Sequence, residues 1–197
     1  MLTELTIKEF IHKVISNDPV PGGGSVSAFN GALATSLAAM VANLTIGRKK
    51  YAEVNEVMED LSARFEELAR QLIIDVDRDS DAYNRVFAAF KLPKETEEEK
   101  AEKARVMEIV LKDACSVPME IMEKCCEAIE LIVEFGAKGS KLAISDAGVG
   151  AAFCKAALQG ASLNVYINTK SMANREYAEE LNKKADAMLE KYCKLAD

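Results

Sequence analysis

The sequence predicts an all-α fold, a single-domain multihelical bundle with a long central helix, which we expect to form a homodimer. Apolar residues recur at intervals of three and four through most of the chain, as they do on the buried face of a helix. The chain has only 4 prolines, no tryptophan, and abundant Ala, Leu, Glu and Lys, a composition that favours helix. A length of 197 residues suits one well-cored domain, residues 1–197, better than two.

The first half of the chain predicts three helices. Residues 6–16 form a short one. A second follows the loop "DPVPGGGS", contains the apolar run from Val26 to Leu44, and ends near Gly47. Small residues spaced three or four apart along this run let neighbouring backbones approach closely, which predicts a buried central helix: Ala28, Ala32, Ser36 and Ala39. The third and longest helix runs from about residue 53 to 91.

The second half predicts further helices. One begins in the charged stretch "KETEEEKAEK" and continues to residue 135, with a kink or restart at Pro118. The stretch "GAKGSKLAIS" is expected to be a loop, after which Asp146 starts a helix of small residues that ends near Asn168. Residues 171–197 form an amphipathic terminal helix. Only "LNVYIN" has strand propensity, and its position inside a helical pattern overrides that preference.

Composition argues against several classes of function. The net charge of −7 does not suit a nucleic-acid surface, which needs a basic patch. Five cysteines without paired spacing fit a reducing compartment, and "MLTELTIKEF" lacks the pattern of a signal peptide, so we expect a cytoplasmic protein. The apolar run is short for a membrane span and is interrupted by polar residues, so we expect no membrane insertion. We also expect no metal site, because Cys125 and Cys126 do not share a helix face and His12 has no neighbouring ligand.

The glycine-rich loop is the first candidate site. It lacks the lysine of a phosphate-binding P-loop, and no apolar strand precedes it. Gly22, Gly23 and Gly24 can expose their N–H groups, Ser25 is a suitable N-cap, and the positive end of the following helix faces the loop. The loop therefore either binds a carboxylate or carbonyl oxygen, or is only a tight turn before a buried helix.

A carboxylate interrupts the apolar stripe of the longest helix. At about 100° per residue, Asp79 lies at the centre of this stripe, Asp75 lies at its edge, and Asp77 projects toward the other side. A carboxylate at a core position costs several kcal/mol unless it is paired, hydrogen-bonded or protonated. Asp79 is therefore either a residue kept for chemistry or one member of a structural salt bridge, with Arg78 or Arg85 as the cation.

Two further groups of polar residues are candidates for binding. Asn164 and Asn168 share a helix face with Asp146, which predicts either a polar pocket between helices or hydrogen bonds to helix backbone. A basic cluster either binds an anionic ligand or is a solvated helix end; it consists of Arg48, Lys49 and Lys50, together with Lys91 and Lys94.

Six segments, taken in order, resemble the formimidoyltetrahydrofolate cyclodeaminase family, which also includes stand-alone methenyltetrahydrofolate cyclohydrolases. They are "PVPGGGSV", "MVANLTIGRKKY", "DRDSDAYNRVFAAFKLPK", "SVP", "ISDAGVGAA" and "GASLNVYIN". Each is weak alone, but the ordered set is specific and covers about residues 10–170. The resemblance implies an all-helical homodimer with a folate site near the glycine-rich loop. It also implies a role in one-carbon metabolism and histidine degradation.

The resemblance also implies residue roles and a reaction. It places an acid–base carboxylate in the D-x-D segment, carried onto Asp79, with Asp75 and Asp77 as the other candidates. Substrate-binding residues are expected among Gly22, Gly23, Gly24, Ser25, Asn43, Lys49, Lys50, Asp146, Asn164 and Asn168. In the basic cluster, the lysines would hold the glutamate tail of a folate.

The implied reaction converts 5-formimidoyltetrahydrofolate to 5,10-methenyltetrahydrofolate and ammonia. It needs no metal or cofactor beyond the folate substrate, and a separate formimidoyltransferase would supply that substrate. Hydrolysis of the methenyl bridge on the same scaffold is the alternative reaction. A non-catalytic, folate-binding helical dimer is the alternative from another class.

Overall fold

The apolar periodicity of the sequence produces six α-helices in the computed structural model, which describes the backbone of residues 1–197 and every side chain except that of Leu142. No strand occurs in this described backbone, and "LNVYIN" is helical, which confirms the all-α prediction. The α-helices are α1 (Ile7–Ile15), α2 (Gly23–Asn43), α3 (Asn55–Phe90), α4 (Glu97–Lys138), α5 (Ile144–Lys170) and α6 (Arg175–Leu195). Short 3-10 helices are η1 (Leu2–Glu4), η2 (Lys49–Val54) and η3 (Lys141–Ala143).

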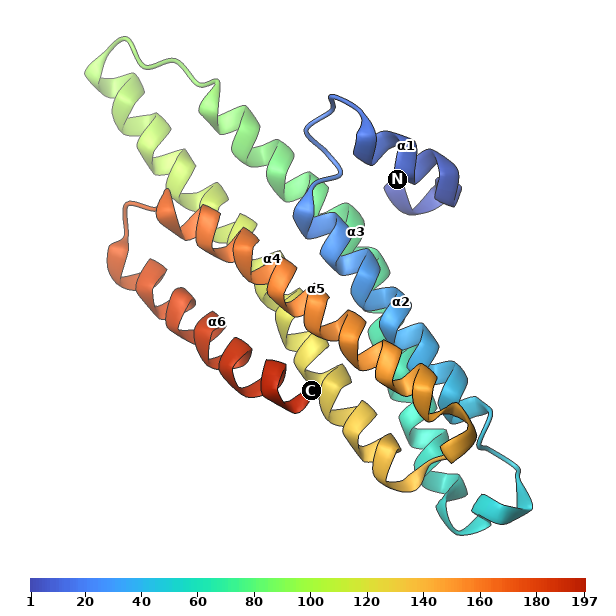
Figure 1. Ribbon diagram of the computed structural model, residues 1–197. Helices are drawn as coiled ribbons and strands as arrows, with labels where there is room; N and C mark the ends of the chain where they lie inside the picture. The colour runs from blue at the N-terminus through green and yellow to red at the C-terminus, as the bar shows by residue number, and fades with distance from the viewer.

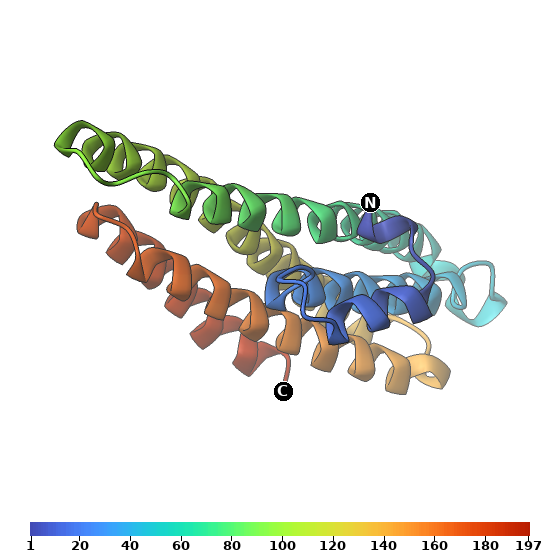
Figure 2. The same cartoon turned by 90° about the horizontal axis from the view of Figure 1, so that it is seen from above.

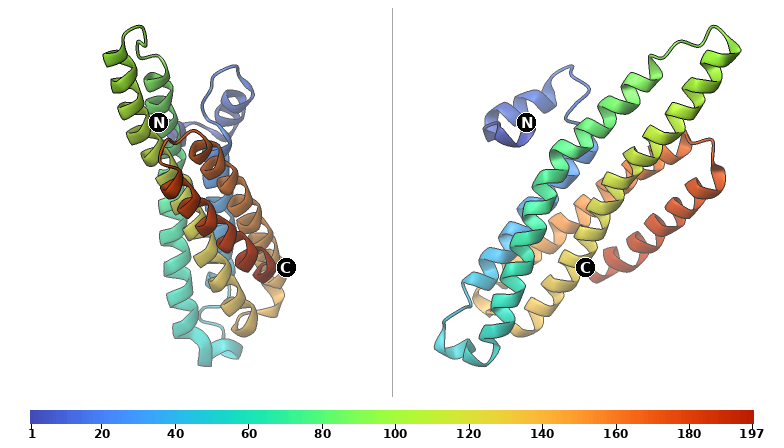
Figure 3. Two further views of the ribbon diagram at one scale, coloured as in Figure 1. Left: turned by 90° about the vertical axis from the view of Figure 1, so that its left-hand side faces the viewer. Right: turned by 180° about the vertical axis from the view of Figure 1, so that it is seen from behind.

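Helices α2 to α5 form an elongated four-helix bundle (Figure 1). In this bundle α2 packs between α3 and α5, and α4 packs against the same two helices from the other side (Figure 2). Helix α6 lies along α4 and α5, while α1 projects away from the bundle (Figure 3). The antiparallel helices α3 and α4 extend beyond the others at the end where residues 91–96 connect them (Figures 1 and 3).

Helix α2 is the central helix of the fold, as predicted. Its small residues Ala28, Ala32 and Ala39 are buried, but Ser36 is exposed, so the predicted small-residue face is wrong at that position. By length and composition α2 is apolar enough to cross a membrane, yet most of it is buried inside the bundle, as in a core helix. It begins at Gly23, earlier than predicted, and ends at Asn43 rather than near Gly47.

Helix α4 runs without a break through Pro118, where a kink or restart was expected. A proline has no N–H, so it leaves the carbonyl of Ala114, four residues earlier, without its helical hydrogen bond. The side chain of Asn168 on α5 donates to this carbonyl oxygen from its Nδ2 at 3.0 Å. The neighbouring helix thus satisfies the group that proline leaves unpaired, and α4 can continue.

The expected loop "GAKGSKLAIS" is shorter than predicted. Helix α4 continues to Lys138, residues 141–143 form η3, and α5 begins at Ile144 rather than Asp146. Gly139 is the C-cap of α4, and its backbone N–H donates to the carbonyl of Phe135. The connection between α4 and α5 therefore consists of residues 139–143 alone.

Candidate functional site

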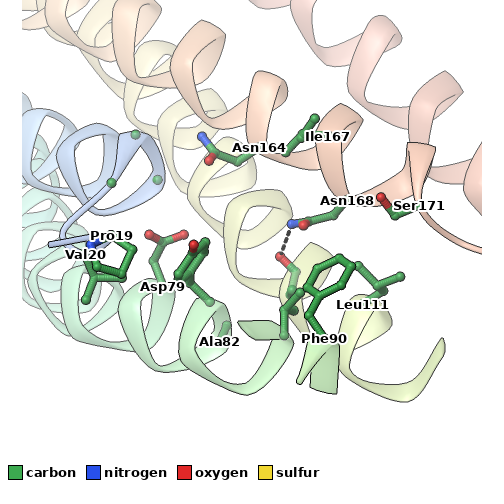
Figure 4. A pocket seen from close by; sticks show the side chains of 16 residues that line it. Pro19, Val20, Asp79, Ala82, Phe90, Leu111, Asn164, Ile167, Asn168 and Ser171 are labelled. Carbon is green, nitrogen blue, oxygen red and sulfur yellow. Dashed lines mark hydrogen bonds between the residues drawn. The ribbon is translucent and has the colours of Figure 1, made fainter. Parts of the chain in front are cut away.

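A cavity of about 330 Å³ opens between the N-terminus of α2 and the C-terminal halves of α3 and α5 (Figure 4). This volume lies at the lower end of the range for small-molecule sites. Residues from five segments line it: Pro19, Val20, Gly22, Gly23 and Gly24 before and in α2; Asp79, Ala82, Tyr83, Val86 and Phe90 of α3; Leu111 and Ala114 of α4; Asn164, Ile167 and Asn168 of α5; and Ser171. Six of the residues that the sequence marked as candidates therefore meet here: three glycines, one carboxylate and two amides.

Asp79 supplies the carboxylate of this pocket. Its half-buried side chain forms no ion pair with any side chain that the structure describes. Burial raises the pKa of Asp79, hydrogen bonds from the side chain and backbone of Ser25 oppose that rise, and the charge of Asp75 adds to it. The salt-bridge interpretation of Asp79 is therefore wrong, because Arg78 pairs with Asp75 and Glu120 instead.

The glycine-rich loop brings the N-terminus of α2 against this carboxylate. A Cβ atom on Gly24 would overlap the carboxyl group of Asp79, so only glycine fits at that position. Gly22 is the N-cap and Ser25 is the third residue of the helix, so the prediction of Ser25 as N-cap is wrong. The sequence left open whether these N–H groups bind a carboxylate or carbonyl oxygen, or belong only to a tight turn. The structure places the protein's own Asp79 beside them, where the helix dipole favours a negative charge.

Ser25 lies behind Asp79 rather than in the cavity lining. Its side chain is fully buried, and its Oγ donates to Asp79 Oδ2 at 2.9 Å. The Oγ of Ser80, the residue after Asp79, lies 3.0 Å from the same Ser25 oxygen. Ser25 thus contacts the pocket carboxylate and not the space that a ligand would occupy.

The two amides of α5, Asn164 and Asn168, both line the pocket and form hydrogen bonds to helix backbone, the two roles that the sequence left open. Asn164 donates from Nδ2 to the carbonyl of Gly160 at 2.9 Å, and Asn168 donates to Ala114 as described above. Each side chain is thereby fixed to helix backbone and also lines the cavity. Because an amide carries both a donor and an acceptor, the Oδ1 atoms remain as acceptors beside the pocket.

Asp75 and Asp77, the other two carboxylates proposed for catalysis, lie outside the cavity. Asp75 is fully buried and accepts hydrogen bonds from Lys124 Nζ at 2.5 Å and Arg78 Nη1 at 2.7 Å, so it belongs to an ion-pair network between α3 and α4. Asp77 accepts hydrogen bonds from the backbone N–H of Leu2 at 2.5 Å and the hydroxyl of Thr3 at 2.6 Å. It therefore holds η1 on the side of α3.

Four predicted substrate-binding residues lie at the opposite end of the bundle (Figure 1). Asn43 ends α2, and its Oδ1 accepts a hydrogen bond from Ser62 at 2.8 Å. Lys49 and Lys50 lie in η2, and Asp146 is in the first turn of α5. Asn43 and Gly23 lie at opposite ends of α2, and Asp146 and Asn168 lie near opposite ends of α5. At a rise of 1.5 Å per residue, each pair is roughly 30 Å apart.

Within one chain these four residues cannot contact a small ligand in the cavity, which corrects their assignment. The basic cluster is divided in the same way. Lys91 follows directly after α3 at the pocket end, with its Nζ 4.0 Å from the ring centroid of Phe87. Lys94 lies in the connection that follows α3, far from Lys49 and Lys50.

The apolar walls of the pocket were not identified from the sequence. Tyr83 and Phe90 on α3 face Ile167 on α5, and these side chains are 41%, 55% and 60% exposed. Large apolar side chains at the mouth of a cavity with one carboxylate and two amides suit a flat, partly polar ligand. Tyr83, four positions after Asp79, and Ile167, three positions after Asn164, could have been proposed as walls, because residues at these spacings share a helix face.

A metal centre finds no support near this pocket. Among the side chains that the structure describes, no group of three or more His, Cys, Asp or Glu is placed to hold a metal ion. The cavity instead offers helix N–H groups, one carboxyl group, amide oxygens and aromatic surface. This set can bind a heterocycle through hydrogen bonds and move a proton.

Comparisons with known proteins agree with this geometry. The family model for Formiminotransferase-cyclodeaminase matches residues 6–187. A methenyltetrahydrofolate cyclohydrolase of Methylorubrum extorquens is 40% identical over 93% of this chain and 88% of its own length. The formimidoyltransferase-cyclodeaminase of Mus musculus is 31% identical over 96% of this chain, which spans only 35% of the mouse protein.

A solved structure is similar over the whole chain. The crystal structure of formiminotetrahydrofolate cyclodeaminase from Thermotoga maritima matches with a TM-score of 0.86 and 30% identity. The match covers 100% of this chain and 96% of that protein. The helical arrangement around the cavity is therefore shared with a protein of that name.

Proposed function

Because this chain belongs to the formiminotransferase-cyclodeaminase family, we propose that its pocket binds a tetrahydrofolate and closes or opens the methenyl bridge between N5 and N10. One observation carries this proposal. The Asp79 carboxyl group lines an apolar cavity without a cationic partner among the described side chains, and burial raises its pKa. A carboxyl group whose pKa is raised keeps its proton to higher pH than a free one does, which suits a group that must give or take a proton at the reacting atoms.

The first candidate reaction is cyclodeamination. The N10 atom of the folate attacks the formimidoyl carbon on N5, the bond from this carbon to the terminal nitrogen breaks, and ammonia leaves. The departing nitrogen takes two protons, one from N10 and one from protonated Asp79, and so leaves as neutral ammonia. The carboxylate that remains then stabilises the cationic methenyl group in a site with little water.

Hydrolysis of the methenyl bridge is the second candidate, and the name of the Methylorubrum extorquens relative favours it. Here the Asp79 carboxylate takes a proton from the attacking water. It returns this proton to the folate nitrogen whose bond to carbon breaks, and the added hydroxyl gives its remaining proton to solvent, so that the carbon becomes a formyl group on the other nitrogen. The two reactions share the ring-closed cation and the same proton carrier, so one pocket serves either.

Binding in attack geometry accounts for the rest of the proposed catalysis. The Oδ1 atoms of Asn164 and Asn168 accept hydrogen bonds from N–H groups of the bound heterocycle, and Tyr83 and Phe90 cover its flat face. Because N5 and N10 belong to the same molecule, the pocket contributes here by holding the folate in the conformer in which both nitrogens lie at the reacting carbon.

Two assays on the purified protein test the proposal. One supplies 5-formimidoyltetrahydrofolate and measures release of ammonia together with formation of the methenyl bridge. The other supplies 5,10-methenyltetrahydrofolate and measures its loss. Turnover in one assay only identifies the reaction. Folate binding by calorimetry without turnover in either assay would leave a non-catalytic folate-binding protein, and no binding would refute the proposal.

We also propose that the chain forms a homodimer through the outer face of α2. No charged residue occurs between Gly23 and Asn43, yet Val26, Leu33 and Met40, each two turns apart, are 40%, 47% and 41% exposed. The projecting helix α1 adds an exposed apolar face of Ile7, Ile11, Val14 and Ile15. A contiguous apolar face of this kind typically marks an interface.

Light scattering tests the dimer. We expect twice the monomer mass at micromolar concentration, and a shift toward monomer for Leu33→Lys. Ile109→Lys is the matched control, since it adds the same charge at a 49% exposed apolar position on α4. A monomeric wild-type protein would contradict the dimer without affecting the proposed chemistry.

A further inference from the structure

We propose that Ser25 is the positioning residue of Asp79: its buried hydroxyl fixes one oxygen of the carboxyl group and thereby sets the group's direction toward the pocket and its readiness to give up a proton. The catalytic consequence rests on the proposed function above. The hydrogen-bond geometry does not.

The geometry links two helices through one hydroxyl. Ser25 on α2 and Asp79 on α3 are 54 residues apart in sequence, and Ser25 Oγ donates to Asp79 Oδ2 at 2.9 Å. Among the side chains that the structure describes, Ser25 makes the one side-chain hydrogen bond to this carboxylate. Ser25 is fully buried, so water does not compete for its hydroxyl. Removing it would leave the carboxyl group without a fixed side-chain partner.

Ser80 extends this hydrogen bond into a series of two. Its Oγ lies 3.0 Å from Ser25 Oγ, and its side chain is also buried. A hydroxyl has one proton, so when Ser25 donates to the carboxylate of Asp79, Ser80 must donate to Ser25. The two serines therefore act in series, and the negative charge of Asp79 orients both.

Gly24 makes the contact sterically feasible. A Cβ atom at this position would overlap the carboxyl group, so any larger residue would push Asp79 away from Ser25. The sequence "GGGS" at the start of α2 thus combines close approach of the backbone with a hydroxyl in the following position. This pairing explains why a serine comes directly after the glycines.

Few charged groups compete with Ser25 for control of Asp79. Helix α2 contributes none, and the nearest residues of α5, Asn164 and Asn168, are neutral. On α4 the pocket residues are apolar, and Lys124 and Glu120 belong to the network around Asp75 and Arg78.

On α3 itself, Asp75 lies one turn before Asp79 and Tyr83 one turn after it, while Asp77 is engaged by Leu2 and Thr3. Burial and Asp75 both raise the pKa of Asp79, and Ser25 lowers it. Ser25 therefore opposes two effects that favour the protonated form. Without it, Asp79 would hold its proton to higher pH.

The test compares Ser25→Ala with a matched control, Ser27→Ala. Ser27 is also a buried serine near the start of α2, but its hydroxyl donates to the carbonyl of Gly23 in its own helix at 2.7 Å. The readout is titration of the Asp79 carboxyl carbon by NMR in protein labelled with 13C-aspartate, with the signal assigned from its loss in Asp79→Asn. This measurement needs no substrate.

We expect Ser25→Ala to move the titration midpoint of Asp79 upward by about 1 pH unit, since a hydrogen bond to a charged group is lost. Ser80→Ala should move it in the same direction by less, and Ser27→Ala should leave it unchanged. Turnover of Ser25→Ala should fall about 10-fold at neutral pH, with KM within about 2-fold of wild type. The pH limit that Asp79 sets, which is the alkaline limit for cyclodeamination and the acidic limit for hydrolysis, should move to higher pH.

An unshifted midpoint in folded Ser25→Ala would overturn the inference, as would an equal shift in Ser27→Ala. Failure of the proposed function has a different signature, which is normal turnover in Asp79→Asn. Even if Asp79→Asn keeps normal turnover, the titration midpoint of Asp79 in the wild-type protein can still depend on Ser25. The two hypotheses are therefore tested separately.

Discussion

Replacing Asp79 with asparagine should abolish most turnover without unfolding the protein. The amide has nearly the same volume as the carboxyl group, so the packing of α3 against α2 is preserved. Its oxygen can still accept the hydrogen bond from Ser25, while the transferable proton and the negative charge are both lost. We expect turnover to fall by about 10²-fold or more, the range typical of removing a general acid–base group.

The effect of this substitution on stability is expected to be small, because two contributions oppose each other. Burial raises the pKa of Asp79 in the folded protein, so the ionised carboxylate lowers stability at neutral pH, and the amide removes that cost. Exchanging a charge-assisted hydrogen bond from Ser25 for a neutral one costs about 1 kcal/mol. The net change should stay within about 2 kcal/mol, or a few degrees in Tm.

The pH dependence of stability gives a second readout on the same protein. Because the folded-state pKa of Asp79 is raised, the folded protein binds its proton more tightly than the unfolded chain does. This contribution to stability is full below the unfolded-state pKa and is lost as pH rises through the folded-state pKa. Asp79→Asn should therefore gain stability relative to wild type as pH increases through that window.

The assay measures turnover of both folate substrates beside thermal melting between acidic and neutral pH. Asp77→Asn is the control, since its carboxylate lies outside the cavity and contacts only η1. We expect this control to lose some stability and to keep turnover within a few-fold of wild type. Normal rates in Asp79→Asn, or activity lost only where the variant is unfolded, would refute the catalytic role of Asp79.

Two further substitutions test the interactions that hold the pocket in shape. Asn168→Ala should destabilise the protein by about 1–3 kcal/mol, because the Ala114 carbonyl that Pro118 leaves free loses its partner; an unchanged urea midpoint would mean that another group satisfies this carbonyl. Lys124→Met should cost about 3–5 kcal/mol, because it removes a partner of the buried Asp75 carboxylate. Most of that loss should be recovered in the double variant with Asp75→Leu, and a double variant no more stable than Lys124→Met would contradict the ion-pair explanation.

Helical periodicity was sufficient to find Asp79, because a polar residue at the centre of an apolar stripe is a signal within one helix. The same periodicity gave the number and approximate bounds of the six α-helices. It could not identify the partner of Asp79. The contact with Ser25 depends on how α2 and α3 are placed relative to each other, and the spacing of residues along either helix does not contain that information.

The misplaced substrate-binding residues show a second limit of the same reasoning. Asp146 shares a helix face with Asn168 and therefore seemed to extend the site, whereas Asn43 was expected there only from the family resemblance. A helical wheel records direction around the axis and ignores distance along it. In helices of 21 and 27 residues, one face extends far beyond the length of a small ligand.

The polar groups of the pocket differ in what they are free to do. Asn164 and Asn168 are tied to helix carbonyls, and the second of these bonds compensates for Pro118 in α4, so their positions are part of the fold. Among the residues that the structure describes, those that donate hydrogen bonds to Asp79 lie in the N-terminal turn of α2. The other polar side chains that line the cavity are these two amides, Tyr83 and Ser171. Among the lining residues, Asp79 therefore supplies the one carboxyl group. A carboxyl group can give up and take back a proton in catalysis, and burial raises the pKa of this one, whereas amides do not act in this way. Cyclodeamination and hydrolysis both require proton transfer to a nitrogen bonded to the one-carbon group. Either reaction in this pocket would therefore depend on Asp79.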